Sequence, residues 1–346
     1  MTPSRVVNVG GFFEASGYNL EKAAAQAAGA GFVRSEATSE EELITDCAGA
    51  RIVLIESSTT CVTRRVVEHL SDCLMIGRTG TGFDNVDVAA ATEKGIVVCN
   101  AAAYCSEEVS DHTVALILAC ARRIVLLDRR VVSGAWGDAE LAAGMRRIKS
   151  QTVGLLGFGR IARLVTRKLS GFGLRVTASD PLVPASEAAS YSVEMLALDQ
   201  MLAEADYVSV HAPLTASTRH LLNANRLRRM KSSAYVINTS RGVLINEADL
   251  VVALREKWIA GAALDVTSIE PLPADSPLRE LPNVILTPHF GAESSDANDE
   301  LQQSTARSIA AVLQGYWPEF PVNPQVRPRE PLRPWTEFVN HWDEDC

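Results

Sequence analysis

The sequence predicts an α/β fold with two doubly wound parallel sheets. Three observations support this prediction. Short apolar runs alternate with amphipathic segments, the 346 residues suffice for two domains, and a glycine-rich turn lies near the middle of the chain. Such alternation implies parallel strands joined by right-handed crossovers. Because the glycine-rich turn follows a first set of alternating elements, two such units should lie in tandem.

The first third of the chain carries the first set of elements. Its apolar runs predict strands at residues 5–9, 52–55, 74–77 and 96–99. The amphipathic segments predict helices at residues 20–28, 40–48, 63–70 and 86–94. After the glycine-rich turn, further strands are predicted at residues 175–178, 207–210, 234–238, 261–265 and 284–287.

Two long helices are expected to carry the chain between the domains. The first, at residues 106–123, is apolar nearly all round in its middle and should be buried, but it is too short for a membrane span. The second, at residues 295–314, should return the chain to the first domain. We therefore expect one discontinuous domain, an inserted domain, and a proline-rich, charged tail that is extended or partly disordered. The expected boundaries are 1–103 with 290–325, 104–289, and 326–346.

A dinucleotide-binding fingerprint accounts for the glycine-rich turn. Gly157 can form the tight turn, Gly159 leaves room for a pyrophosphate, and Ala162 fills the third small position, where helix and strand pack closely. The helix that starts at Arg160 and Ile161 offers free amide groups and its positive dipole end to the phosphates. The sequence therefore predicts a nucleotide site at this turn.

The context of the turn strengthens this interpretation, because an isolated glycine pattern is weak evidence. An apolar strand precedes the turn, an amphipathic helix follows it, and Asp180 closes the next strand. Asp180 can accept hydrogen bonds from ribose hydroxyls and would repel a 2′-phosphate. The expected cofactor is therefore NAD rather than NADP.

Charge and cysteine content exclude several classes of function. The net charge of −9 and a pI near 5.3 argue against binding to nucleic acid or to an anionic membrane surface. No signal peptide or transmembrane run is visible. The seven cysteines are scattered, without a spacing that would hold a metal, which is typical of a reducing compartment. We expect a cytoplasmic protein without a metal site.

Three polar motifs follow the fingerprint, each at or just beyond the end of a predicted strand, and they contain Arg241, Glu270 and His289. Ligands of open α/β sheets bind at the carboxyl ends of strands, so these side chains can converge. A histidine backed by a carboxylate can protonate a developing alkoxide, and an arginine fork can hold a carboxylate. This is the chemistry that hydride transfer to a 2-oxo acid requires.

Each of these residues also has an ordinary structural interpretation. Arg241 could cap a helix, Glu270 could be a loop acid, and His289 could be a hydrogen-bonded histidine at a strand end. Their joint placement after a nucleotide turn makes three coincidences improbable. For His211 we favour the structural interpretation, in which its backbone rather than its imidazole lies near the cofactor. The remaining histidines, His69, His112, His220 and His341, are not expected in the site.

On these motifs the chain resembles the D-isomer-specific 2-hydroxyacid dehydrogenase family. The resemblance covers about residues 53–315 and includes the run at 80–87, the fingerprint and the three polar motifs. It implies a Rossmann NAD-binding domain inserted in a flavodoxin-like substrate domain, and a homodimer formed through the cofactor domain and the region 106–123. The activity implied is NAD-dependent interconversion of a small 2-oxo acid and a D-2-hydroxy acid.

The resemblance also assigns residue roles. Arg241 would bind the substrate carboxylate and carbonyl, Glu270 would partner the histidine, and His289 would be the general acid or base. Backbone amides around Thr81 and Gly82 would bind the carboxylate. Asp265 would help to place the nicotinamide carboxamide. The further cofactor contacts expected are Thr239 and the loop that carries His211, Ala212, Pro213 and Thr218.

Details of the motifs leave two questions open. Residues 77–82 and 288–292 look closest to phosphoglycerate dehydrogenases, whereas residues 103–112 look like bacterial relatives of the C-terminal binding proteins. An NAD(H)-sensing protein that recruits partners, with little catalytic role, is therefore the alternative. Glu56 replaces an arginine usual in phosphoglycerate dehydrogenases. Arg78 could reach a second anionic group of the substrate, or it could point to solvent or pair with Glu56.

Overall fold

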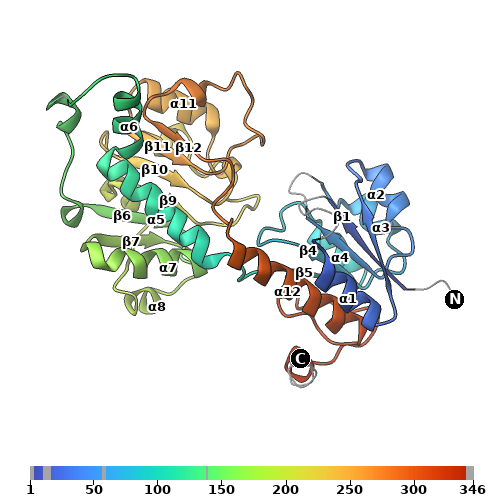
Figure 1. Cartoon of the computed structure of the whole chain (residues 1–346). Coiled ribbons are helices and arrows are strands. Elements are labelled where there is room, and N and C mark those ends of the chain that lie inside the picture. Colours follow the sequence, from blue (N-terminus) through green and yellow to red (C-terminus); the bar gives the residue numbers. More distant parts are fainter. Residues whose placement is uncertain (1–3, 11–16, 57–59, 138, 340–346) are drawn as a thin grey trace. The chain divides into compact units, whose positions relative to one another are not determined.

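The computed structural model describes residues 4–10, 17–56, 60–137 and 139–339. The chain divides into two compact units, each with its own parallel sheet (Figure 1). Unit 1 comprises Met1–Cys105 and Ser294–Cys346, and unit 2 comprises Ser106–Glu293. The second unit is thus inserted in the first along the chain.

Unit 1 is built on a five-stranded parallel sheet in the order β2-β1-β3-β4-β5, which is the flavodoxin-like order. Its strands are β1 (Arg5–Val9), β2 (Gly31–Ser35), β3 (Ile52–Ile55), β4 (Met75–Arg78) and β5 (Val97–Asn100). Its helices are α1 (Asn19–Ala27), α2 (Glu40–Asp46), α3 (Arg64–His69), α4 (Val88–Glu93) and α12 (Ser295–Leu313). The predicted strands of this unit are confirmed, each to within a residue. The half-exposed strand β2 was not predicted, because it lacks an apolar run.

The sheet of unit 1 is covered on both faces, since successive residues of a strand point to opposite sides. Val53 and Ile55 pack in a core with residues of α2, α3 and α4. Ile52 and Leu54 pack on the opposite side with residues of α1 and α12. Burial on both faces explains why the strands read as continuous apolar runs.

The residues after α12 belong to unit 1 and pack on it. Asn323 is fully buried and accepts a hydrogen bond from the Val98 amide at 2.8 Å, while its side chain donates to the Ile96 carbonyl at 3.0 Å. Phe338 is also buried, in the core beside α12. The proline-rich composition predicted an extended path but did not reveal these anchoring contacts.

Unit 2 is built on a seven-stranded parallel sheet in the order β12-β11-β10-β9-β6-β7-β8. Its strands are β6 (Thr152–Leu156), β7 (Arg175–Ser179), β8 (Glu194–Met195), β9 (Tyr207–Val210), β10 (Tyr235–Asn238), β11 (Gly261–Leu264) and β12 (Val284–Leu286). The order reverses between β6 and β9, as in the doubly wound nucleotide-binding fold, and places a ligand-binding crevice at the carboxyl ends of those strands. The predicted α/β class with two parallel sheets is confirmed.

Helices cover both faces of this sheet. They are α5 (Ser106–Arg122), α6 (Ile124–Val132), α7 (Arg160–Leu169), α8 (Ala185–Ala189), α9 (Leu198–Glu204), α10 (Ala224–Leu227) and α11 (Glu247–Arg255). Short 3-10 turns lie at Ala139–Ala142, Ile148–Ser150, Ser170–Phe172, Gly242–Leu244 and Pro277–Glu280. Helices α5 and α7 pack together on one face (Figure 1), where Leu116 and Val165 meet Val153 of β6. Residues of α9 and α11 pack on the other face, against β9.

Among the helices that the described residues form, none combines the length and apolarity needed to cross a membrane.

Candidate active site

The turn between β6 and α7 has the geometry that a dinucleotide requires. Gly157 has φ +93°, and a Cβ there would lie 2.8 Å from the backbone nitrogen of Ala212. Gly159 is the N-cap of α7, and a Cβ on Gly159 would meet no atom within 4 Å, so the space beside it is open. Ala162 is fully buried where α7 meets the sheet. The amides at the start of α7, which include those of Arg160 and Ile161, are therefore approachable by phosphates.

Asp180 follows β7 and is tied to this turn. Its Oδ2 accepts a hydrogen bond from the Phe158 amide at 2.9 Å, and its Oδ1 accepts one from the Leu182 amide at 2.8 Å. An ionised carboxylate has about four acceptor positions, so these two bonds leave capacity for hydroxyl donors. The residues of the turn and Asp180 thus fit an NAD molecule bound at this edge of the sheet.

The loop after β9 lies against the same turn through the backbone of His211 and Ala212. Burial lowers the pKa of His211 to about 4, so its imidazole is neutral at pH 7, and Nε2 lies 2.9 Å from the Ser209 hydroxyl. This agrees with the structural interpretation of His211. Thr218 closes the loop by donating from Oγ1 to the Pro213 carbonyl at 2.7 Å.

His289 and Glu270 form the central pair of the site. His289 Nδ1 lies 2.7 Å from Glu270 Oε2, and Glu270 Oε1 accepts a hydrogen bond from the Thr267 amide at 3.0 Å. Burial would raise the pKa of the Glu270 carboxyl. The hydrogen bond and charge of His289, the Thr267 amide and the charge of Arg241 together hold it below its ordinary value. Glu270 is therefore ionised at neutral pH and orients the imidazole.

Arg241 reaches this pair through a close backbone approach. It follows β10, and its Nη1 donates to the Ser240 carbonyl at 2.8 Å. A Cβ on the next residue, Gly242, would fall 2.0 Å from the backbone of Thr267, in the loop that also carries Glu270. Only glycine permits this contact, which brings the backbone next to Arg241 against the loop that carries Glu270. Within unit 2, His289 therefore contacts Glu270 directly, and the charge of Arg241 acts on Glu270.

Asp265, at the end of β11, is almost completely buried and hydrogen-bonded. It accepts from Thr287 Oγ1 at 2.6 Å and from the amides of Phe290 and Gly291 at 2.9 Å each. His112 of α5, which the sequence did not mark as a site residue, lies 3.4 Å from Asp265 Oδ1. The sequence around His112 does not indicate a partner for it, and the packing of α5 on the sheet reveals this contact. Thr239, at the end of β10, also contacts α5.

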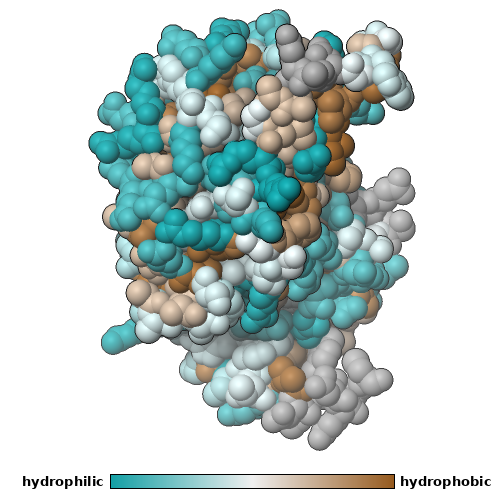
Figure 2. All heavy atoms as spheres, turned by 90° about the vertical axis from the view of Figure 1, so that its left-hand side faces the viewer, coloured by the Kyte–Doolittle hydropathy of each residue, from teal (hydrophilic) through white to brown (hydrophobic). Residues whose placement is uncertain are grey.

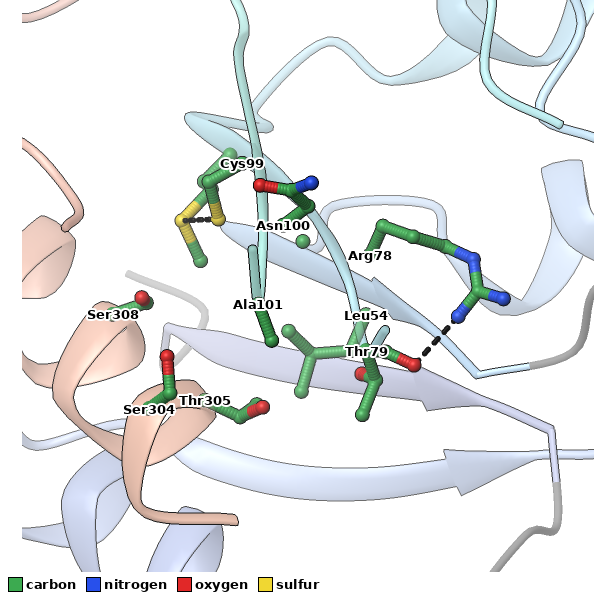
Figure 3. Close-up of a pocket in the computed structure, with 11 residues that line it drawn as sticks. Leu54, Arg78, Thr79, Cys99, Asn100, Ala101, Ser304, Thr305 and Ser308 are labelled. Atoms are coloured by element: carbon green, nitrogen blue, oxygen red, sulfur yellow. Dashed lines mark hydrogen bonds between the residues drawn. The ribbon is translucent and has the colours of Figure 1, made fainter. Parts of the chain in front are cut away.

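Three further predicted residues lie in unit 1, in the loop after β4. Arg78 is 9% exposed, and its Nη1 donates to the carbonyls of Ile55 at 3.1 Å and Thr79 at 2.6 Å. Figure 3 shows this guanidinium folded back onto Thr79, beside a small cavity that residues of β4, β5 and α12 line. The Thr81 carbonyl accepts a hydrogen bond from Asn100 at 2.6 Å, which fixes the loop next to Gly82. Arg78 therefore does not point to solvent.

Comparison with known proteins places the chain in a family. Residues 114–291 match the model of the D-isomer specific 2-hydroxyacid dehydrogenase, NAD binding domain. The chain is 36% identical over 287 residues to glyoxylate reductase of Korarchaeum cryptofilum, covering 82% of this chain and 85% of that protein. It is 39% identical over 294 residues to D-3-phosphoglycerate dehydrogenase of Methanocaldococcus jannaschii, covering 85% of this chain but only 55% of the longer relative.

Solved structures agree with these relatives. D-lactate dehydrogenase from Aquifex aeolicus, complexed with NAD and lactic acid, superimposes with a TM-score of 0.79 at 25% identity, covering 90% of this chain and 96% of that one. Glyoxylate reductase from Paecilomyes thermophila shares the fold with a TM-score of 0.83 at 23% identity, covering 94% of this chain and 100% of that one. The chain belongs to the D-isomer specific 2-hydroxyacid dehydrogenase family, and its cofactor is NAD.

Proposed function

We propose that this protein interconverts a small 2-oxo acid and the corresponding D-2-hydroxy acid, with His289 as the proton-transferring residue. Bound NAD(H) supplies or takes up the hydride. The observation that carries the proposal is the 2.7 Å contact between His289 Nδ1 and ionised Glu270, with Arg241 beside them. All three lie in the unit that contains the nucleotide turn. The proposal thus rests on a proton donor, the carboxylate that orients it and a cation, all of which lie in the same unit.

His289 has the arrangement that a general acid needs. Its Nδ1 hydrogen is donated to Glu270, so Nε2 is the nitrogen that exchanges a proton with substrate. In the direction of reduction, Nε2 gives its proton to the carbonyl oxygen, which becomes the hydroxyl group. The negative charge of Glu270 stabilises the imidazolium before this transfer. In the reverse direction Nε2 takes the hydroxyl proton.

Arg241 is assigned to the carboxylate and carbonyl of the substrate. Its guanidinium carries five donors in a planar fork that suits bidentate binding of a carboxylate. The hydrogen bond from Arg241 Nη1 to the Ser240 carbonyl helps to orient this fork. In unit 1, the amides near Thr81 and Gly82 are proposed to bind a substrate carboxylate, because the Asn100 side chain holds their loop in place.

We further propose that the protein is a homodimer formed through unit 2. The helix α6 has no buried residue, and Val132 and the following Trp136 are 80% and 84% exposed. Figure 2 faces the side of Figure 1 on which α6 lies and shows apolar patches between polar ones. Large exposed apolar side chains are typical of protein interfaces. A monomeric mass by light scattering at micromolar concentration would contradict this assignment.

The test of the activity is NADH oxidation with a panel of 2-oxo acids, namely glyoxylate, pyruvate, hydroxypyruvate, oxaloacetate and phosphonopyruvate. Turnover of at least one, with the D rather than the L hydroxy acid oxidised in reverse, is the expected result. Tight NADH binding without turnover of any of them would refute the proposal and favour an NAD(H)-sensing protein that binds partners. The panel also ranks substrates by side chain, which the motifs alone do not.

A further inference from the structure

The segment that carries His289 is hydrogen-bonded to one buried residue, Asp265, through both its backbone carbonyl and its carboxylate. The backbone of His289 has φ +56°, a left-handed conformation that costs energy for any residue except glycine. Its amide donates to the Asp265 carbonyl at 2.7 Å, and the next two amides, of Phe290 and Gly291, donate to the Asp265 side chain. Three consecutive amides therefore converge on Asp265. Such a strained conformation persists only where the surroundings define it.

Hydrogen bonds hold the Asp265 side chain in place, and those from Thr287 and His112 form a connected series. Burial would raise the pKa of its carboxyl. Hydrogen bonds from His112, from Thr287 and from the amides of Phe290 and Gly291 outweigh burial and hold the pKa well below its ordinary value. Asp265 is therefore ionised and can only accept hydrogen bonds. Thr287 Oγ1 donates its one proton to Asp265 Oδ1 at 2.6 Å.

The tautomer of His112 follows from the hydrogen bond that Thr287 donates to Asp265. Its Nε2 lies 3.0 Å from Thr287 Oγ1 and 3.4 Å from Asp265 Oδ1. Because the Thr287 proton is already used, Thr287 must accept at this contact, and Nε2 must carry the hydrogen. A neutral His112 is thus the tautomer protonated at Nε2. The donors then run in one direction, from His112 through Thr287 to Asp265.

The position of His112 on α5 gives this chain a rigid support. Helix α5 packs on α7 and on strands β10 and β11. The next residue, Thr113, makes a second contact with the sheet, 2.8 Å from Thr239 Oγ1. The space around Asp265 is also tightly filled, because a Cβ on Gly291 would lie 2.9 Å from Asp265 Oδ2 and 3.5 Å from the His112 ring. Little freedom remains for Asp265 to adopt another rotamer.

We propose that His112 is a positioning residue for His289, because its Nε2 hydrogen holds Thr287 and Asp265 in the arrangement that fixes the backbone of residues 289–291. This inference rests on the proposed function, since it assigns His112 a part in the same reaction. His112 acts through these partners and need not touch the substrate. Without the Nε2 hydrogen of His112, the orientation of the His289 ring should become less well defined. This change should slow the chemical step and leave NADH binding unaffected.

The kinetic test compares His112→Ala, which removes the donor, with His112→Gln, whose amide retains one. His112→Ala should lower kcat by about tenfold or more, the scale of a small misplacement of a catalytic group, and leave the Kd for NADH unchanged. The isotope effect with NADH deuterated at the transferred position should rise, because hydride transfer becomes rate-limiting. His112→Gln should recover most of the loss. A wild-type kcat in His112→Ala, or equal losses in both variants, would overturn the proposal.

A matched control removes another histidine from a helix. His69 of α3 is exposed and its Nδ1 contacts only the Arg65 carbonyl, at 2.8 Å, so His69→Ala should leave kcat and the isotope effect unchanged. Thermal unfolding of each variant separates a positioning loss from a folding loss.

A second measurement needs no turnover and no variant. Long-range ¹H–¹⁵N spectra of the wild-type protein at neutral pH should show His112 protonated at Nε2. A ring protonated only at Nδ1 would overturn the inference. If the wild-type protein turns over no 2-oxo acid, the proposed function fails. The spectrum still tests the hydrogen bonds of His112 in that case. Failure of the proposed function and failure of the inference on His112 can therefore be told apart.

Discussion

His289 donates its Nδ1 hydrogen to Glu270 across 2.7 Å, from a left-handed backbone that follows directly after strand β12 and its Thr287-Pro288 extension. The pair lies partly exposed, with 41% of the histidine side chain accessible. Partial exposure suits a residue that must exchange protons with a substrate. The other oxygen of Glu270 accepts a hydrogen bond from the Thr267 amide, so both carboxylate oxygens are hydrogen-bonded.

The first prediction concerns the two residues assigned to substrate chemistry. His289→Ala and Arg241→Ala should each lower turnover at least about a hundredfold, the usual scale for a positioned proton donor. NADH binding should remain nearly intact, because neither residue belongs to the nucleotide turn. Steady-state kinetics with fluorescence titration of NADH measures both quantities. Near-normal rates in either variant would refute the assignment.

Glu270→Gln should be milder and should change the pH profile. The pKa of Glu270 is lowered in the folded protein, so the carboxylate is charged throughout the neutral range. Removal of this charge favours neutral imidazole, and the limb of the kcat/KM profile that follows His289 protonation should move to lower pH. Profiles from pH 5 to 9 test this shift. An unchanged profile would show that Glu270 does not couple to His289.

A third prediction concerns cofactor choice. Asp180→Ala removes a ribose acceptor and a charge that repels a 2′-phosphate, so it should weaken NADH binding and improve NADPH binding. Asp180 also anchors the Phe158 and Leu182 amides, and thermal unfolding should therefore be recorded beside the two dissociation constants. Equal use of NADH and NADPH by the unaltered protein would contradict the expected role of Asp180.

Much of the fold was predictable because most strands are buried on both faces. Strand β3, for example, alternates between two cores and therefore reads as a continuous apolar run. Strand β2 and helix α6 were not predicted, since β2 is half exposed and α6 has no buried residue. Local composition carries little signal where tertiary burial is weak. The contacts of Asn323 were unpredictable for a related reason, because its partners are backbone groups far away along the chain.

The candidate site was predictable where its residues end strands. Arg241 and His289 sit in motifs whose position after strands β10 and β12 implies convergence at one sheet edge. His112 carried no such signal. It lies inside a helix and meets Thr287, 175 positions away along the chain, so only the packing of α5 brings the two together. The left-handed backbone of His289 was likewise invisible, because nothing in its residue type demands it.

The last prediction concerns Arg78, for which the sequence left two roles open. Its Nη1 donates to the carbonyls of Ile55 and Thr79, and its guanidinium lies 3.0 Å from the position of a Cβ on Gly80. These contacts favour a role in holding the loop before Thr81. Arg78→Ala should then lower kcat/KM for pyruvate and for phosphonopyruvate to a similar extent. It should also reduce stability by about 1–3 kcal/mol, because buried carbonyls lose a donor.

Arg64→Ala is a matched control for this experiment, because it removes an exposed cation from the same unit, paired with Glu93 at the surface. It should change neither substrate preference nor stability appreciably, since exposed pairs contribute little. If Arg78→Ala instead lowers kcat/KM by about tenfold or more for phosphonopyruvate and not for pyruvate, the role in holding the loop is contradicted. A desolvated charge pair is worth roughly 1.5–3 kcal/mol, which is ample for that preference. Arg78 would then bind the second anionic group of a substrate.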